Sequence, residues 1–161
     1  MKNRFTLVVV LAAIAALSLS LVSCSVDNED IIGTWGCTYS LKEIKDNIEP
    51  QRNEVEKDKY YGYVIVFNAD GTITCPQGRI FGIYDGDTWM IDGNQLVIDR
   101  TYVWDIKKLN KSTLSLKNHS YGVYVTDPAE AGGSTYVDWY TVESANDADV
   151  IETRELQFAR Q

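Results

Sequence analysis

The alternation of apolar and polar residues along the chain predicts a series of short β-strands. Segments rich in β-branched and aromatic residues recur at short intervals, and turn-forming residues separate them. The expected strands are 33–41, 60–68, 72–75, 79–85, 87–91, 95–99, 101–107, 113–117, 135–143 and 151–160. Many short strands joined by tight turns are typical of an antiparallel sandwich or barrel, so the expected fold class is all-β.

The residues between these segments favour hairpin connections. Gly71, Gly86 and Gly93 each follow an aspartate, and Asp-Gly supplies the positive φ angles that tight turns need. The three prolines all fall outside the expected strands, because a proline in a strand would lack the N–H that a sheet requires. These turn signals support consecutive antiparallel pairing of the strands.

Two longer connections interrupt this regular spacing. Segment 42–59 is dense in charge, and its residues Ile44 and Ile48 would share one face of a helix that Pro50 then ends. We therefore expect a short helix followed by a loop, lying over an edge or an opening of the sheet. Segment 126–134 has the composition of a surface loop.

The first 23 residues differ in composition from the rest of the chain. Lys2 and Arg4 precede the almost entirely apolar run 5–22, and Ser23 stands before Cys24. This arrangement is typical of a secretory signal, although the run is also long enough for a retained membrane anchor. The sequence Leu-Val-Ser-Cys that ends at Cys24 resembles the lipobox of bacterial lipoproteins, in which the cysteine is acylated and becomes the new N-terminus.

That resemblance implies a division of the chain into three parts and a location in the cell envelope. Residues 1–23 would be a lipoprotein signal peptide, 24–30 an acylated Cys24 with an acidic tether, and 31–161 the folded domain. Attached acyl chains would anchor the protein to the outer membrane. A cysteine followed by Ser25 and acidic residues resembles the surface-export signal of Bacteroidetes-type lipoproteins, so exposure at the cell surface is expected alongside the alternative of the periplasmic face.

Two motifs in the folded part resemble those of a known family. Gly33 and Trp35 open the first expected strand, and Gly-x-Trp at that place resembles the lipocalin signature, in which the tryptophan closes one end of the barrel. Residues 66–72, VFNADGT, resemble a hairpin common in lipocalin-like lipoproteins, and the strands that follow at 102–106 and 114–116 have matching spacing. The resemblance implies an antiparallel up-and-down lipocalin-like β-barrel of about 8–10 strands.

The last strand adds a geometric expectation to this resemblance. In lipocalins an arginine of the last strand packs across the signature tryptophan. If residues 151–160 run antiparallel to the first strand, Arg160 lies beside Trp35 and its guanidinium stacks on the indole. The alternative is a solvated arginine near the end of the chain.

The cysteine count allows two interpretations once Cys24 carries lipid. Cys37 and Cys75 are both expected to point inward, because each shares a strand face with apolar residues. In an exported protein, two cysteines are typical of one disulfide. The alternative is a pair of separate buried thiols, since cysteine packs well as a small apolar residue.

Composition excludes several classes of function. A formal charge of −8 argues against a nucleic-acid surface, which needs basic patches. The single histidine, His119, makes a multi-histidine metal site impossible and a histidine-based catalytic set improbable. No motif indicates a catalytic residue, a metal or a cofactor, and we expect a monomeric protein that is not an enzyme.

The aromatic residues offer the best candidates for a binding site. We expect Tyr39, Tyr102 and Trp104 to point inward, and Tyr61, Tyr63 and Tyr124 to border an open mouth of the barrel. Such residues could line a pocket for a small apolar ligand, or they could simply fill a small barrel. Two hypotheses follow: a lipid-anchored, non-catalytic module that binds a small apolar ligand, and a filled barrel that presents its surface to a glycan or a protein.

Overall fold

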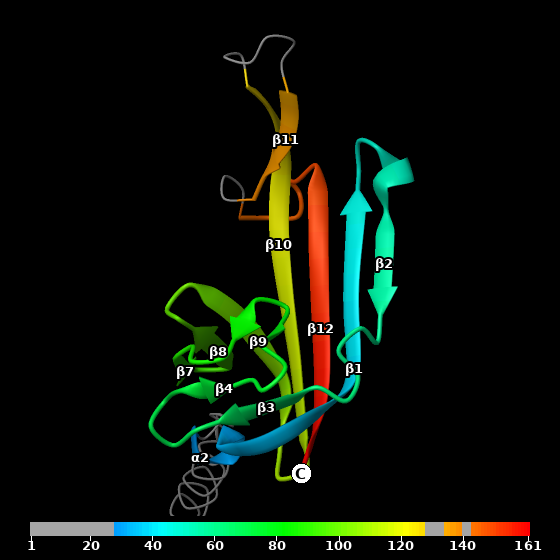
Figure 1. The fold of residues 1–161 in the computed structure, drawn as a ribbon. Helices are drawn as coiled ribbons and strands as arrows, with labels where there is room; N and C mark the ends of the chain where they lie inside the picture. The colour runs from blue at the N-terminus through cyan, green and yellow to red at the C-terminus, as the bar shows by residue number, and fades with distance from the viewer. Residues whose placement is uncertain (1–27, 128–133, 140–142) are drawn as a thin grey trace, which may run out of the picture.

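In a computed structural model, which describes residues 28–127, 134–139 and 143–161, nearly every regular element is a strand (Figure 1). This confirms the expected all-β class. The elements are α2 (Asn28–Ile31), β1 (Gly33–Asp46), η1 (Pro50–Arg52), β2 (Glu54–Lys57), β3 (Val64–Phe67), β4 (Ile73–Thr74), β5 (Arg79–Ile80), β6 (Ile83–Tyr84), β7 (Trp89–Asp92), β8 (Gln95–Ile98), β9 (Tyr102–Leu109), β10 (Thr113–Asp127), β11 (Ser134–Asp138) and β12 (Val150–Arg160).

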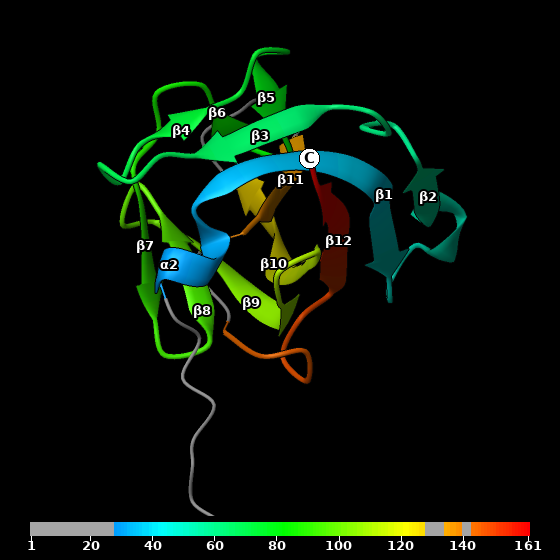
Figure 2. The ribbon, with the colours of Figure 1, turned by 90° about the horizontal axis from the view of Figure 1, so that it is seen from below.

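Eight of the strands form a nearly closed up-and-down barrel. Each strand in the series β4-β3-β1-β12-β10-β9-β8-β7 pairs antiparallel with its neighbour, and Figure 2 shows the ring end-on. The segments of β4 and β7 meet through an isolated bridge between Thr72 and Thr88. There the Ile73 N–H donates to the Asp87 carbonyl at 2.7 Å, and the Trp89 N–H to the Gly71 carbonyl at 2.8 Å. The predicted antiparallel barrel is therefore confirmed.

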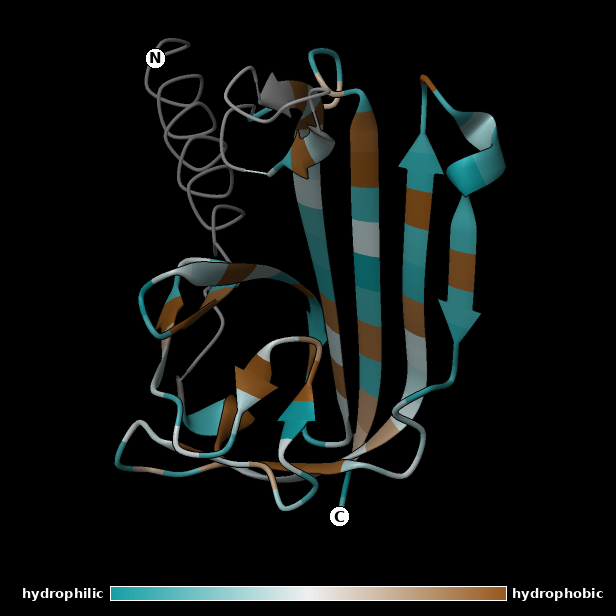
Figure 3. Ribbon diagram, turned by 45° about the horizontal axis from the view of Figure 1, so that its top comes forward, coloured by the Kyte–Doolittle hydropathy of each residue, from teal (hydrophilic) through white to brown (hydrophobic). Residues whose placement is uncertain are grey.

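Three strands run well beyond the ring. The upper parts of β1 (41–46), β10 (118–127) and β12 (150–155) stand above the barrel, with β2 paired to β1 and β11 paired to β10 (Figures 1 and 3). We call this five-stranded sheet the extension. Figure 3 shows hydrophobic and hydrophilic residues alternating along its long strands, as expected for a sheet with two different faces.

The expectation of a helix and loop over 42–59 was wrong for the residues that β1 and β2 occupy, 42–46 and 54–57, and a short helical turn and loops form the rest. Strand β1 continues to Asp46, a single 3₁₀ turn follows at η1, and β2 returns beside β1. Lys42 lies directly across from Glu56 in this pairing, and opposite charges at facing positions favour the register. Strand β10 is likewise longer than its expected range of 113–117, so His119 lies in a strand.

Side chains fill the barrel interior. The largest fully buried side chains lie on its strands and loops and include Trp35, Trp104, Phe67, Phe158, Ile65, Ile73, Leu96, Ile98 and Leu114. Burial of this much apolar surface stabilises the barrel, at roughly 25 cal/mol per Å² removed from water. An eight-stranded barrel is just wide enough for such filling.

The expected contact between Arg160 and Trp35 closes the lower end of the barrel. The guanidinium carbon of Arg160 lies 4.4 Å from the centre of the buried indole ring. The Trp35 Nε1–H donates to the Ile31 carbonyl at 2.7 Å, and Arg160 Nη1 donates to the Ile32 carbonyl at 3.0 Å. Gly33 has a φ of 136°, and a Cβ there would lie 2.9 Å from Arg160 Nη1, so glycine is required at this position.

The two thiols of the barrel are buried and free. Cys37 lies on β1 and Cys75 follows β4, and no disulfide joins them. The predicted bridge is therefore wrong in this structure, and the alternative of two separate buried thiols is the one observed. Burial raises the pKa of Cys37 to about 11. Its Sγ donates a hydrogen bond to the Tyr39 carbonyl at 3.4 Å. Both thiols pack as small apolar groups.

Candidate functional site

A hairpin and a turn plug the upper end of the barrel. The β5–β6 hairpin and the turn before β3 place Phe81 and Tyr60 edge to face, with ring centres 4.7 Å apart. Tyr63 packs against Tyr60 at 5.4 Å, and Ile80 and Ile83 are fully buried beneath them. The interior of the barrel is therefore separated from the space above it by packed side chains.

Above this plug the extension and the barrel rim enclose an open groove, which we call the mouth groove. Its two cavities measure about 300 and 590 Å³ and share Tyr102, Glu152 and Arg154. The first is lined by Lys42, Glu56, Lys59, Tyr60, Arg79, Phe81, Gly82, Tyr84, Tyr102, Glu152 and Arg154. The second adds Gln95, Thr101, Val103, Asp105, Asn118, Ser120 and Trp139, together with Lys117, His119 and Tyr121 of β10.

The floor of the groove continues the inner face of the barrel with polar residues. In the last barrel row, Leu156 of β12 lies between Ser40 of β1 and Leu116 of β10. One row higher, on the same face, Arg154 lies between Lys42 and Asn118. Because residues two apart on a strand share a face, this step changes the inner surface from apolar to polar.

Glu152 is the most deeply placed charge in the groove. Its side chain is only 8% exposed, and its carboxylate pairs with the Arg154 Nε–H and lies 4.0 Å from Lys42 Nζ. A buried carboxylate needs such partners because desolvation of an isolated charge is costly. Arg154 and Lys42 are thereby held on the groove floor, with 24% and 30% of their side chains exposed.

Basic residues outnumber acidic ones in the smaller cavity. Lys42, Lys59, Arg79 and Arg154 line it, against Glu56 and Glu152. Lys59 pairs with Glu56 at 2.9 Å. Among the described residues Arg79 has no carboxylate partner, and its Nη1 donates instead to the Tyr84 hydroxyl at 3.5 Å. This part of an acidic protein is locally positive.

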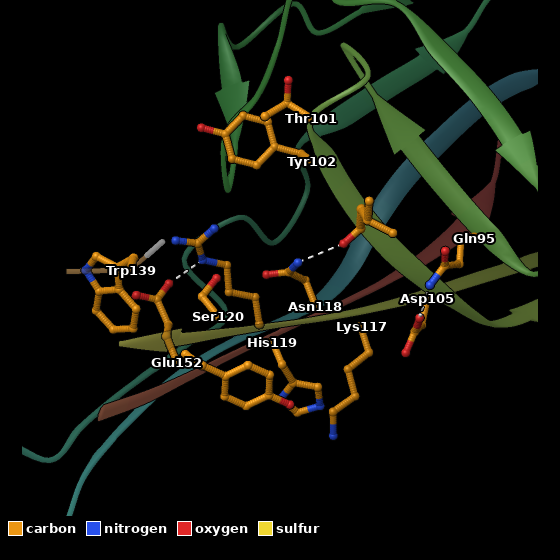
Figure 4. Close-up of a pocket in the computed structure, with 13 residues that line it drawn as sticks. Gln95, Thr101, Tyr102, Asp105, Lys117, Asn118, His119, Ser120, Trp139 and Glu152 are labelled. Carbon is orange, nitrogen blue, oxygen red and sulfur yellow. Dashed lines mark hydrogen bonds and ion pairs between the residues drawn. The ribbon is translucent and has the colours of Figure 1, made fainter. Parts of the chain in front are cut away.

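Aromatic side chains stand on both sides of the floor. Tyr102 and Trp139 lie on opposite sides of the larger cavity, with Asn118 and Ser120 between them (Figure 4). Tyr84 borders the smaller cavity, and both tyrosines are 45% exposed. Exposed ring faces beside hydrogen-bonding side chains suit a ligand that has both polar groups and flat, weakly polar faces.

The sequence-predicted pocket residues occupy different parts of the molecule. Tyr102 lies in the groove, whereas Trp104 is buried in the barrel core and Tyr63 packs against the plug. Tyr61 is 68% exposed in the turn before β3, and it lines none of the described cavities. Tyr39 does not point inward, because a bulge between Cys37 and Tyr39 shifts the alternation and leaves Tyr39 opposite the exposed Gln157.

Tyr124 lies near the far end of the extension and not at the barrel mouth. Its hydroxyl donates to the Asp46 carboxylate, and Arg52 Nη1 donates to the Tyr124 oxygen at 3.2 Å. Burial alone would raise the pKa of the Asp46 carboxyl. Its pKa nevertheless lies below the ordinary value, because the carboxylate accepts hydrogen bonds from the N–H groups of Glu49 and Ile48 and from the Tyr124 hydroxyl, and the positive charge of Arg52 is nearby. This cluster ties the β1–β2 hairpin to β10.

His119 lies on the opposite face of β10 from Asn118, so it borders the larger cavity from that face and not from the groove floor (Figure 4). Its Nδ1 is 3.0 Å from the Thr153 hydroxyl, and burial, together with the charge of Lys117, lowers its pKa. Among the described residues no group of three or more histidine, cysteine, aspartate or glutamate side chains could hold a metal ion. Nothing in this arrangement resembles a nucleophile with its base.

Sequence reasoning missed most of the groove. Lys42, Lys59 and Arg79 sit in segments without a recognisable motif. Glu152 and Arg154 did carry a signal, because they precede Leu156 and Phe158 on the same strand face, and charged residues that continue an apolar face indicate a lined mouth. The predicted anchor, Cys24, lies outside the described residues.

Comparison with protein-family models, with curated proteins and with solved structures finds no match to this chain. Within the described ranges, no helix combines the length and the apolar character needed to cross a membrane. The assignment of a function therefore depends on the geometry and the chemistry of the chain itself.

Proposed function

We propose that this protein is a lipid-anchored envelope lipoprotein whose lipocalin-like barrel is a scaffold and whose mouth groove binds a glycan. The observation that carries the proposal is the change of the inner face from apolar to polar between the row of Leu156 and the row of Arg154. Below it the side chains pack against one another; above it they face an open space.

The filled interior favours this function over the carriage of a small apolar ligand. Apolar ligands bind in pockets whose walls are mostly hydrophobic and that cover most of the ligand surface. Trp35, Phe67 and Trp104 would be the walls of such a pocket, but they are fully or almost fully buried by their neighbours and line neither cavity of the groove. An apolar ligand would have to displace the Tyr60–Phe81 plug to reach them.

The polarity of the groove suits a sugar. Asn118 and Ser120 offer donors and acceptors for hydroxyl groups, and Tyr102 and Trp139 offer ring faces on which a sugar ring can stack. The strand positions of Asn118 and Ser120 are fixed by pairing with β12, so little conformational entropy is lost on binding.

The position of the tether supports an outward-facing groove. Helix α2 begins at Asn28 and lies at the closed end of the barrel, opposite the extension (Figures 1 and 2). A fully extended chain spans about 3.5 Å per residue, so an acylated Cys24 would lie within about 15 Å of Asn28. The closed end would then face the membrane, and the mouth groove would face away from it.

Binding of the full-length protein to a glycan array, followed by calorimetry with the best ligand, tests the proposal. The protein is kept in a polyoxyethylene detergent, because glycoside detergents would compete for a sugar site. We expect Tyr102→Ala to weaken binding by about tenfold, as expected for loss of a stacked ring at a site centre. The free energy of unfolding should change by no more than about 0.5 kcal/mol, because Tyr102 is an exposed side chain.

The matched control is Tyr136→Ala. Tyr136 lies on β11, is 52% exposed and lines none of the described cavities, so its removal should leave affinity unchanged. Equal losses of glycan affinity in the two variants would argue against the mouth groove as the binding site. A lipid or other apolar molecule that copurifies with the native protein, together with an array without glycan binding, would favour the apolar-ligand hypothesis.

A further inference from the structure

We propose that the mouth groove selects acidic glycans, with its smaller cavity holding a carboxylate or sulfate group of the polymer. The inference rests on the proposed function and adds the chemical class of the ligand. It is carried by the placement of Lys42, Lys59, Arg79 and Arg154 around one cavity of about 300 Å³.

The charge of this cavity runs against that of the whole chain. The protein has 23 acidic and 15 basic residues, yet the cavity has four basic residues and two acidic ones. The two acids are already engaged, Glu56 by Lys59 and Glu152 by Arg154 and Lys42. A hollow with a local excess of positive charge attracts anions more strongly than its count of charges suggests, because low-dielectric walls focus the field.

Arg79 is the cation best placed to meet a ligand. It lies at the start of β5 and is exposed, and within the described part of the chain its guanidinium donates a hydrogen bond to the Tyr84 hydroxyl at 3.5 Å. Arg79 and Lys59 line the same cavity, and the positive charge of Arg79 opposes the rise that Glu56 causes in the pKa of Lys59. An oxyanion between them would relieve this repulsion and could accept hydrogen bonds from both.

The rest of the groove favours an acidic glycan over an acidic polypeptide. The floor offers Asn118 and Ser120, and the sides offer Tyr102 and Trp139, which together match hydroxyl groups and sugar ring faces. An acidic polypeptide would need apolar pockets for the side chains that anchor most peptides. The apolar side chains at the mouth, Phe81 and Tyr60, are instead packed into the plug.

The test compares three families of soluble ligands on the full-length protein in the same detergent. Oligogalacturonates and sulfated heparin oligosaccharides carry the anion on a sugar, neutral oligosaccharides carry none, and polyglutamate carries it on a peptide. We expect the acidic sugars to bind, with an affinity that falls as salt rises because exposed charges are screened. We expect polyglutamate to bind at least about tenfold more weakly, because it cannot use the ring faces and hydroxyl contacts.

The variant Lys59→Gln/Arg79→Gln tests the cavity itself. Loss of two charge-assisted hydrogen bonds should weaken the binding of an acidic oligosaccharide by about tenfold or more and flatten its salt dependence. Lys108→Gln/Lys111→Gln removes the same charge from exposed positions outside the groove, so it should leave affinity unchanged. Circular dichroism of both variants shows whether the fold is kept.

Each alternative outcome has a distinct meaning. Tyr102-dependent binding of neutral oligosaccharides that Lys59→Gln/Arg79→Gln does not alter would overturn this inference and leave the proposed function standing. Equal losses in the two charge variants would show that net charge alone attracts the ligand, which also contradicts a built anion site. Preferential binding of polyglutamate would replace the glycan with an acidic peptide, and binding of none of the ligands would contradict both proposals.

Discussion

The barrel and the extension share the three long strands β1, β10 and β12, but the side chains on the shared inner face differ between the two parts. On β12, Phe158 and Leu156 face the barrel core, while Arg154 and Glu152 face the groove from the same side of the strand. Hydrogen bonding between the strands is continuous across this boundary. The difference shows that one long sheet can separate stability from binding: the lower rows bury apolar surface, and the upper rows present fixed polar groups to solvent.

Substitution of a barrel side chain should have the largest effect. Phe158→Ala removes a ring that is 1% exposed, and we expect the free energy of unfolding to fall by about 3–5 kcal/mol. Denaturant unfolding followed by tryptophan fluorescence measures this loss. Gln157→Ala, one position away on the exposed face, should change it by less than about 0.5 kcal/mol. Similar losses for the two variants would mean that the barrel is not tightly packed.

An ion pair in the extension should have an intermediate effect. Arg154→Met leaves the buried Glu152 with Lys42 as its one remaining cation, at 4.0 Å, and should destabilise the protein by about 1–3 kcal/mol. Glu152→Gln/Arg154→Met removes the uncompensated charge and should recover part of that loss. Denaturant unfolding of Arg154→Met, Glu152→Gln and the double variant gives the coupling between the two residues, and a coupling near zero would mean that the pair is solvated.

Strand β1 carries two groups whose titration should change the stability of the protein, Asp46 in acid and Cys37 in alkali. Asp46, in the extension, has a lowered pKa, so its contribution to stability is present above the ordinary carboxyl pKa and is lost as pH falls through the lowered value. Tyr124→Phe removes one of its hydrogen bonds and should raise the pKa of Asp46 toward the ordinary value. Carbon-13 NMR of the aspartate carboxyl groups measures this change; an unmoved Asp46 resonance would contradict the cluster.

Cys37, in the barrel, should make the stability of the protein fall in alkali, and its effect on stability at neutral pH should be the smallest of those predicted. Its pKa is raised to about 11, so the folded state favours the neutral thiol and stability is lost as pH rises from about 9 to about 11. The unfolding free energy of Cys37→Ala should depend less steeply on pH over that range than that of the native protein. Identical slopes would mean that the thiol is not buried.

The parts of this structure that follow local chemistry could be predicted from the sequence. Gly71, Gly86 and Gly93 have the positive φ angles that their Asp-Gly turns require. The Trp35–Arg160 contact was also accessible, because consecutive antiparallel pairing brings the last strand back beside the first. Alternation along β1 failed at one point, where the bulge beside Cys37 reverses the direction of Tyr39, and no residue type at that position announces a bulge.

The groove was harder to predict because it combines residues that are distant in sequence. Lys42 and Arg154 become neighbours only through the register of β1 and β12, and Arg79 joins them from a short hairpin above the barrel. The charges of 42–59 were assigned to a helix and loop because charge density alone does not distinguish an exposed helix from an edge hairpin. The pairing of β1 with β2 inside this segment depends on tertiary contacts that a local sequence pattern does not contain.

The central claim is that ligand binds above the plug and not inside the barrel, and the four tryptophans of the chain report on both places. Trp139 lines the groove, whereas Trp35 and Trp104 are buried in the barrel and Trp89 packs against its core. Their indole N–H signals are resolved by nitrogen-15 NMR of the labelled full-length protein in detergent, titrated with the best ligand from the glycan array. We expect the Trp139 signal to shift with ligand while those of Trp35 and Trp104 stay in place; shifts of Trp35 and Trp104 with an unmoved Trp139 would show that the ligand enters the barrel and would overturn the proposed function.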